Sequence, residues 1–339
     1  MKPAIILAIV SSLVIVGGLY KAYGSVDKTM TSVPAPVYDS FIHWKQENGK
    51  SYGTNSEEDY RLKMFAKNFE FIKVETKPEH TFTMKLNQFA DLSFDEFIAS
   101  FGGVVPSTDL KSNVELETIP KPENYSWDSR KDWRGVAVTA VKNQGQCGSC
   151  WAFGTTGSIE GAYAIKHHKL KSFSEQQLVD CNTETNHGCN GGMFMGAYDY
   201  IAEKGLLEES EYPYTARKGY CQYSMKVNDA SKLLHVNGYK MVPADDQNQL
   251  ALAIEKLPVA VAIMATPAVQ MYHKGIFNDW TCGGGINHAV LAVGYAPEYF
   301  IVKNSWGPTW GEAGFIRFAR KTAGKGICSI TTIPIYPVL

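Results

Sequence analysis

The stretch Gln144-Gly145-Gln146-Cys147-Gly148-Ser149-Cys150-Trp151-Ala152-Phe153 combines an amide side chain, two glycines and two cysteines, and then continues into an apolar pattern of helical spacing. The pattern is carried by Trp151, Ile159, Ala162, Tyr163 and Ile165. It predicts a helix that begins near Cys150. A cysteine at a helix N-terminus lies near the positive end of the helix dipole and near free main-chain N–H groups, which favour its thiolate form. The stretch therefore predicts a nucleophilic thiol.

The C-x-x-C spacing of Cys147 and Cys150 also permits two other interpretations, a redox pair and half of a zinc site. The sequence contains no second C-x-x-C pair and no Cys…His-x-x-x-His partner, which weakens the zinc hypothesis. We expect no metal and no cofactor.

Length and composition bound the class of protein. A chain of 339 residues is long enough for one large or two modest domains, each with its own core. Charged residues make up 20% and the formal net charge is −1, so we expect no nucleic-acid partner. The seven cysteines all lie between Cys147 and Cys328. In a secreted chain this odd number leaves one free thiol, and the other six can form disulfides.

The N-terminus indicates the compartment. Lys2 precedes an apolar run from Pro3 to Tyr20, and Ala22-Tyr23-Gly24 offers small residues for a signal peptidase. We expect residues 1–24 to be a cleaved signal peptide. The alternative is an uncleaved signal anchor, the one case in which the chain would associate with a membrane. Either way the remainder enters the secretory pathway, where disulfides persist.

Residues 25–118 indicate a separate helical segment without cysteine. Val33 to Pro36 is expected to be a linker, followed by a helix that carries Val37, Phe41 and Trp44 on one face. A longer helix is expected from about Glu57, and Ser93-Phe94-Asp95-Glu96 is the pattern of a capping box that opens a third, short helix. On these patterns alone the segment could be a small helical bundle of unknown purpose.

The rest of the chain changes from helical to strand-like patterns. Ser174 to Gln177 is a second capping-box pattern, whose helix should end near Cys181, and Gly188 to Gly192 indicates a loop. Beyond Leu233, short runs rich in Val, Ile, Tyr and Phe predict strands at 259–264, 289–295, 299–303 and 315–319. A helical half followed by a strand-rich half predicts an α+β fold with a cleft between the two.

Two polar residues beside the predicted strands complete a possible catalytic set with Cys150. His288 precedes one strand and Asn304 follows the next. An imidazole can accept the thiol proton and later return it to a leaving amine, and an amide oxygen can orient the imidazole from its far nitrogen. Taken singly, a histidine beside a strand is usually a core residue and an asparagine before serine is usually in a turn.

Taken together, these residues resemble the papain family of cysteine proteases, and the cathepsin L-like members in particular. Cys147 to Trp151 matches the pattern C-G-[SA]-C-[WY], and the order Cys, His, Asn is that of the family. Glu57, Arg61, Phe65, Asn68 and Ile72 match the first propeptide motif, except that Thr76 replaces its last Asn. Asn87, Phe89 and Asp91 match the second motif, except that Lys85 replaces its leading Gly.

The resemblance implies a papain-like fold of two domains, one helical and one barrel-like, at residues 119–339, preceded by a helical inhibitory propeptide at 25–118. It assigns Cys150 as nucleophile, His288 as base, Asn304 as its orienting partner, and the Gln144 side chain with the Cys150 N–H as the oxyanion hole. Trp306 would cover the His–Asn bond. The implied disulfides are Cys147–Cys189, Cys181–Cys221 and Cys282–Cys328, which leave Cys150 free. Asn124 is a possible N-glycosylation site.

The resemblance also places the pocket for the second substrate residue before the scissile bond (P2). The backbone of Gly191 and Gly192 should pair with extended substrate. The pocket is expected to be lined by apolar residues, namely Met193, Phe194, Ala262, Ile286, Ala289 and Ile333. Since none of them is acidic, we expect apolar P2 residues to be preferred.

We therefore expect a monomeric cysteine endopeptidase made as a zymogen, acting on proteins and peptides in a lysosome-like or food-vacuole-like compartment or outside the cell. Its own propeptide would be its intramolecular inhibitor. No occluding insertion is evident near the cleft, which favours an endopeptidase over an exopeptidase. The alternatives are a catalytically silent binding protein of this fold, which would lack the nucleophile, and a thiol–disulfide oxidoreductase.

Overall fold

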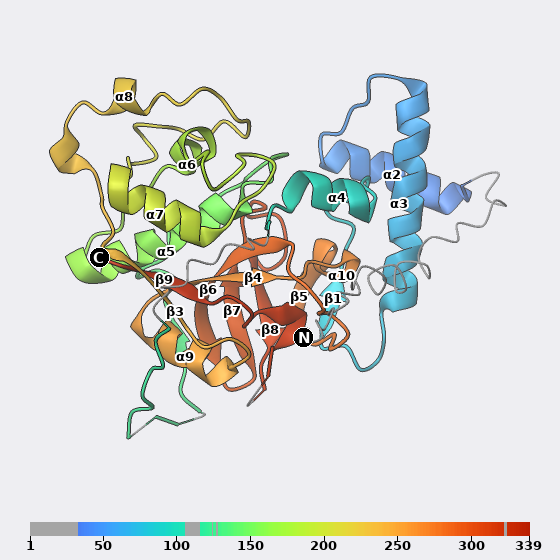
Figure 1. Ribbon diagram of the computed structural model, residues 1–339. Coiled ribbons are helices and arrows are strands. Elements are labelled where there is room, and N and C mark those ends of the chain that lie inside the picture. The colour runs from blue at the N-terminus through green and yellow to red at the C-terminus, as the bar shows by residue number, and fades with distance from the viewer. Residues whose placement is uncertain (1–32, 106–115, 124, 127, 322–323) are drawn as a thin grey trace, which may run out of the picture.

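The structure is a computed structural model, and it describes residues 33–105, 116–123, 125–126, 128–321 and 324–339. The predicted signal peptide and Asn124 lie outside the described residues. Among those described, no helix combines the length and apolarity that a membrane crossing requires. Figure 1 shows three parts: the first helices, a lobe of helices, and a lobe built around a sheet.

The first part, residues 33–105, which we call the pro-segment, contains α2 (Ala35–Glu47), α3 (Asn55–Glu75), β1 (Phe82–Met84) and α4 (Phe94–Phe101). The helical lobe contains α5 (Cys150–His167), α6 (Glu175–Cys181), α7 (Phe194–Lys204) and α8 (Tyr223–Lys226). The sheet lobe contains β3 (Gly238–Met241), α9 (Gln247–Lys256), β4 (Val259–Ile263), α10 (Pro267–Gln270), β5 (Tyr272–Phe277), β6 (His288–Ala296), β7 (Tyr299–Lys303), β8 (Phe315–Ala319) and β9 (Ile335–Val338), together with β2 (Lys131–Asp132).

The pro-segment helices form around an aromatic core. Val37, Phe41 and Trp44 are the buried residues of α2, as their spacing predicts, and Phe65 of α3 packs edge-on against Phe41 with ring centroids 5.3 Å apart. The expectation of a linker up to Pro36 is wrong. Ala35 and Pro36 already belong to α2, because the fixed φ of proline suits the first turn of a helix.

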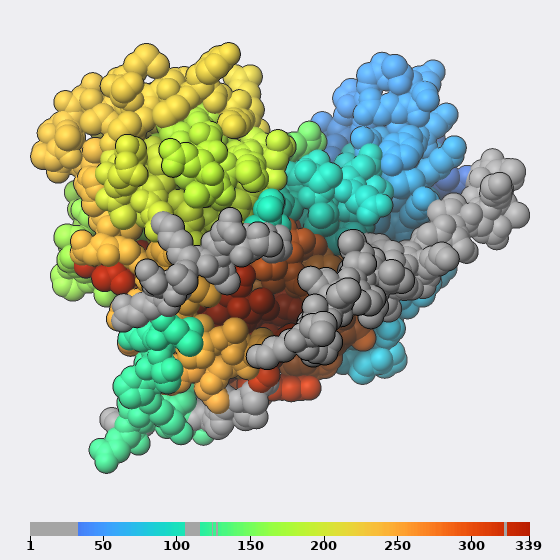
Figure 2. All heavy atoms as spheres, in the orientation of Figure 1, coloured from blue at the N-terminus to red at the C-terminus, as the bar shows by residue number. Residues whose placement is uncertain are grey.

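The end of the pro-segment lies against the other two parts (Figure 2). Helix α4 begins with the predicted capping box, in which Ser93 and Glu96 cap each other's main-chain N–H. Strand β1 is an element that the helical patterns did not predict: it pairs antiparallel with β5 of the sheet lobe, Phe82 opposite Gly275. The pro-segment therefore binds the rest of the chain partly through main-chain hydrogen bonds.

Helix α5 is buried along most of its length, where the helical lobe packs against the sheet lobe. Its glycines allow this packing, because a Cβ at Gly157 would lie 2.9 Å from Leu291, and one at Gly161 would lie 2.6 Å from Pro258. The second predicted capping box, at α6, is only half formed. Ser174 accepts the Gln177 N–H, but the Gln177 side chain bonds Gly205 and Leu207 instead of returning to Ser174.

The strands form one sheet in the order β1-β5-β8-β7-β6-β4-β9-β3, with β2 pairing to β6. All four strands predicted from the sequence are present, and two of them, 299–303 and 315–319, have the predicted bounds. Strands β6 and β7 are antiparallel neighbours, with Leu291 opposite Lys303. This pairing brings the start of β6 beside the end of β7, which are the positions of His288 and Asn304.

A buried ionic cluster ties the segment before α5 to helices α5 and α6. The Lys142 ammonium lies 2.8 Å from a carboxylate oxygen of Glu160 and 2.6 Å from one of Glu175, and both carboxylates are almost completely buried. Because unpaired buried charges are costly, the loss of one partner would destabilise the fold strongly.

The structure contains the three disulfides implied by the resemblance, Cys147–Cys189, Cys181–Cys221 and Cys282–Cys328. Two of them fix the helical lobe and the third lies in the sheet lobe. Cys150 is left as the one free thiol among the seven cysteines, and it is buried.

Candidate active site

Cys150, His288 and Asn304 meet where α5 packs against the sheet. Cys150 is the first residue of α5, and Ala289, the residue after His288, lies in the same buried cluster as Cys150. His288 Nε2 lies 2.7 Å from Asn304 Oδ1, so the imidazole donates to the amide oxygen. This bond leaves Nδ1 of the imidazole without a hydrogen-bond partner among the described residues. Asn304, the residue that the sequence indicated, therefore orients the imidazole.

Trp306 covers the imidazole. Its ring is nearly parallel to that of His288, with centroids 4.4 Å apart, and it is completely buried. The predicted role of an apolar cover over the His288–Asn304 bond agrees with this packing, because the indole keeps water from competing for that hydrogen bond.

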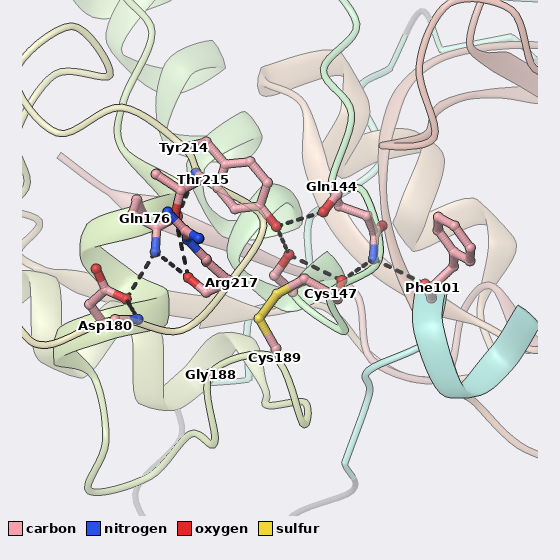
Figure 3. Close-up of a disulfide and its surroundings, with 12 residues drawn as sticks. Phe101, Gln144, Cys147, Gln176, Asp180, Gly188, Cys189, Tyr214, Thr215 and Arg217 are labelled. Atoms are coloured by element: carbon pink, nitrogen blue, oxygen red, sulfur yellow. Dashed lines mark hydrogen bonds between the residues drawn. A yellow bond between two sulfur atoms is a disulfide. The ribbon is translucent and has the colours of Figure 1, made fainter. Parts of the chain in front are cut away.

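The Gln144 side chain points toward Phe101 and Cys147 (Figure 3). Its Nε2 donates to the carbonyl of Phe101, the last residue of α4, at 3.1 Å, and to the carbonyl of Cys147 at 2.9 Å. The side-chain oxygen accepts the Ser305 hydroxyl at 2.7 Å, which fixes the amide so that its N–H groups face Phe101. A main-chain oxygen of the pro-segment thus occupies a position at which a donor would stabilise a developing oxyanion.

The pro-segment continues from Phe101 across both lobes as extended backbone. The N–H of Gly103 donates to the Asn287 carbonyl at 3.0 Å on the sheet side. On the helical side, the N–H of Gly192 donates to the Gly103 carbonyl at 2.9 Å, and the N–H of Val105 donates to the Gly192 carbonyl at 3.3 Å. Gly192 thus pairs with extended chain, as expected for substrate, but the partner here is the protein's own pro-segment.

Gly103 is required at this crossing. Its φ is +146°, and a Cβ there would lie 2.2 Å from the carbonyl oxygen of Gly148, two residues before Cys150. The Gly191 φ of +108° likewise belongs to a region that side chains rarely adopt. Glycine in both segments therefore permits their backbones to approach closely.

Burial of the pair changes its electrostatics. Burial raises the pKa of the Cys150 thiol to about 12, against the smaller opposing effect of the N–H groups of Ala289, Trp151 and Cys150 itself. Burial also lowers the pKa of His288 to about 4, although its bond to Asn304 and the nearby Phe101 carbonyl oppose this. These directions favour the neutral form of both groups at neutral pH, so burial outweighs the helix-terminus effect expected from the sequence.

The residues predicted to line the P2 pocket come together. Met193, Phe194, Ala262 and Ala289 belong to one buried apolar cluster, and Ile286 and Ile333 are partly buried against it. Val104 of the pro-segment packs against the same cluster. The structure adds Asn186, which the sequence analysis missed: its side-chain oxygen accepts the Met193 N–H at 2.7 Å and so holds the chain beside Gly192. A lone asparagine in a loop gives no signal that would have identified it.

Two further groups escaped the sequence analysis. The main-chain carbonyl of Asn287 accepts a hydrogen bond from the main chain of the pro-segment, and the residue type of Asn287 does not predict such a contact. Arg61 lies 3.1 Å from Glu96 of α4 and 3.8 Å from Glu57, one turn earlier in α3, so Glu96 is its main carboxylate partner. The spacing of four residues to Glu57 is visible in the sequence, whereas the partner in α4 depends on how the helices pack.

Comparisons with known proteins show the family to which the chain belongs. Residues 124–338 match the model of the papain family cysteine proteases, and residues 41–97 match that of the cathepsin propeptide inhibitor domain (I29). Vignain of Phaseolus vulgaris is 38% identical, with 98% of this chain and 94% of that protein covered. A cathepsin L-like proteinase of Fasciola hepatica is 39% identical, with 88% and 93% covered.

A solved structure of digestive procathepsin L 3 from Tenebrio molitor larval midgut has a TM-score of 0.78 and 38% identity, with 90% of this chain and 100% of that chain covered. The similarity therefore spans the pro-segment as well as both lobes. The chain belongs to the papain family of cysteine proteases and is a cathepsin L-like peptidase made as a proenzyme with an I29 propeptide domain.

Proposed function

We propose that the processed protein is an endopeptidase in which Cys150 attacks the scissile carbonyl. His288 takes the thiol proton and returns it to the leaving amine, Asn304 orients the imidazole, and Gln144 and the Cys150 N–H stabilise the oxyanion. The observation that carries this proposal is the bond from Gln144 Nε2 to the Phe101 carbonyl, which also lies near the His288 imidazole. The Gln144 amide thus holds a carbonyl oxygen at the position that the carbonyl oxygen of a substrate would occupy during the reaction.

The test uses a thiol-directed epoxide and a fluorogenic dipeptide amide with an apolar residue followed by Arg. The acid-processed protein should hydrolyse the amide, and the epoxide should abolish hydrolysis while labelling Cys150 only. A redox enzyme would instead turn over a disulfide substrate, and a silent binding protein would do neither.

We propose that residues 25–118 inhibit the enzyme until they are cleaved, and that 1–24 is the signal that directs the chain to the secretory pathway. Anchoring of Glu117 and Ile119 on the sheet lobe supports a peptidase unit that begins near residue 119. The Glu117 N–H donates to Met241, and both main-chain groups of Ile119 bond the Gln249 side chain. N-terminal sequencing of the secreted and of the processed protein tests both boundaries.

Acid is expected to release the pro-segment, through carboxylates that hold it together. Asp91 is buried and accepts from Lys50 at 3.0 Å and from the Tyr52 hydroxyl at 3.0 Å. Although burial opposes it, the Ser93 N–H and Arg61 lower the pKa of Glu96. A carboxylate with a lowered pKa stabilises the fold above its ordinary pKa, and this stabilisation is lost as the pH falls through the lowered value. We therefore expect the purified proenzyme to mature faster at pH 4 than at pH 7.

The charge itself can be tested at constant pH. Glu96→Gln and Asp91→Asn should speed maturation at pH 7, whereas Glu70→Gln, on a largely exposed carboxylate of α3, should not. Gel electrophoresis over time gives the rates. Equal rates at both pH values, or no effect of either variant, would contradict the mechanism.

The P2 pocket is expected to accept Leu, Val or Phe and to reject Arg by about ten-fold or more, because an unpaired cation there is costly to desolvate. Occupation of the apolar cluster by Val104 supports this expectation. A positional-scanning peptide library measures the preference. Ile333→Glu should raise the acceptance of Arg relative to Leu, since it adds a carboxylate at the pocket. A preference for Arg in the unaltered enzyme would show that the pocket is misassigned.

A further inference from the structure

Every hydrogen-bonding group of Gln144 is engaged in the structure. Its main-chain N–H donates to the Ser305 carbonyl at 2.8 Å, and its side-chain amide bonds Ser305, Cys147 and Phe101. The remaining group is the main-chain carbonyl, and it accepts the Tyr214 hydroxyl at 2.8 Å. Gln144 is completely buried, so its carbonyl would have no ready substitute for this bond.

The Tyr214 hydroxyl holds a second group as well. Ser149 Oγ lies 2.6 Å from it, and because the tyrosine proton is given to Gln144, the serine donates to the tyrosine oxygen. Ser149 is the residue directly before Cys150 at the start of α5. One hydroxyl therefore bridges the two segments that carry the oxyanion donors, the Gln144 side chain and the Cys150 N–H (Figure 3).

Tyr214 is itself held in place from both sides. Its main-chain N–H donates to a carboxylate oxygen of Glu209 at 2.8 Å. Its ring packs edge-on against Phe153, one turn into α5, with centroids 4.9 Å apart. A side chain fixed at its backbone and at its ring can hold its hydroxyl at a defined position.

We propose that Tyr214 is a positioning residue of the oxyanion hole, which acts through Gln144 and Ser149 and does not touch substrate. The inference rests on the proposed catalytic role of Gln144 and Cys150. The stabilisation of a transition state depends on donors placed within a fraction of an ångström, so loss of a fixed bridge between them lowers the rate without removing either donor.

Tyr214→Phe keeps the ring and removes the bridge. In the acid-processed enzyme we expect kcat for a peptide amide to fall about ten-fold, the equivalent of about 1.4 kcal/mol, with KM little changed. The rate at which iodoacetamide alkylates Cys150 should stay the same, because that displacement forms no oxyanion. The matched control is Tyr212→Phe, which removes a buried hydroxyl two residues away that donates to Asp180 at 2.8 Å. It should leave kcat within two-fold of the unaltered enzyme.

Two more variants separate positioning from general structure. When Gln144 is already replaced by Ala, the additional change Tyr214→Phe should lower kcat far less than ten-fold. The side-chain donor that Tyr214 positions is then absent. Ser149→Ala removes the other end of the bridge and should lower kcat with unchanged alkylation, so the test does not depend on a single variant.

The inference is overturned if Tyr214→Phe matches Tyr212→Phe. It is also overturned if kcat and alkylation fall together, or if the full loss persists without Gln144. Failure of the proposed function would be seen differently, as absence of peptide hydrolysis by the unaltered enzyme.

Discussion

Cys150→Ala is expected to lower kcat for peptide hydrolysis on the order of 10⁶-fold, as is found when the nucleophile of a catalytic set is removed. The thiol carries the chemistry, and its loss leaves a small apolar side chain in a buried position, so folding and secretion should persist. The variant is matured by tagged wild-type enzyme, which is then removed, so that failure to self-process is not mistaken for inactivity. Hydrolysis of a fluorogenic amide gives kcat.

Asn304→Ala serves as the graded control in the same assay. It should lose less activity, because Cys150 and His288 survive and only the orientation of the imidazole is weakened. If Cys150→Ala retained turnover within a hundred-fold of the unaltered enzyme, the assignment of the nucleophile would be wrong.

The second large effect concerns the thiol in the proenzyme. With its pKa raised to about 12 by burial, Cys150 should be almost entirely protonated at neutral pH. At pH 7 this pKa leaves a thiolate fraction of roughly 10⁻⁵, about a thousand-fold less than an ordinary cysteine has. We expect removal of the pro-segment to expose Cys150 and His288 to water, so that their pKa values return toward those of an ion pair. Alkylation by iodoacetamide at pH 7 should therefore be at least about 10³-fold slower in the proenzyme than in the processed enzyme.

The measurement is the mass gained by the intact protein over time. Since six of the seven cysteines are in disulfides, one label per chain is expected, and the unfolded proenzyme in urea should react at an ordinary rate. Alkylation of the native proenzyme within ten-fold of the processed rate would show that the pro-segment does not suppress the thiolate.

The sequence determined the elements whose signals are local. The helix beginning at Cys150, the capping box of Ser93 and Glu96, and the bounds of β7 and β8 follow from periodicity and caps, which depend on neighbouring residues. The order and types of Cys150, His288 and Asn304 indicated the family. The disulfide pairing came from the resemblance alone, because spacing leaves many pairings open.

The tertiary structure alone decided how distant segments meet. Three of these contacts use groups without a sequence signature. They are the pairing of β1 with β5, the bonds of Gly103 to Gly192 and Asn287, and the bridge from Tyr214 to Gln144 and Ser149. Main-chain N–H and C=O groups are the same in every residue apart from proline, which has no N–H. A tyrosine hydroxyl has no partner until the loop that carries it is placed. The same holds for the pKa of Cys150: the helix terminus in the sequence favours a thiolate, but burial in the folded protein raises the pKa, since desolvation of the charge outweighs the N–H groups that oppose it.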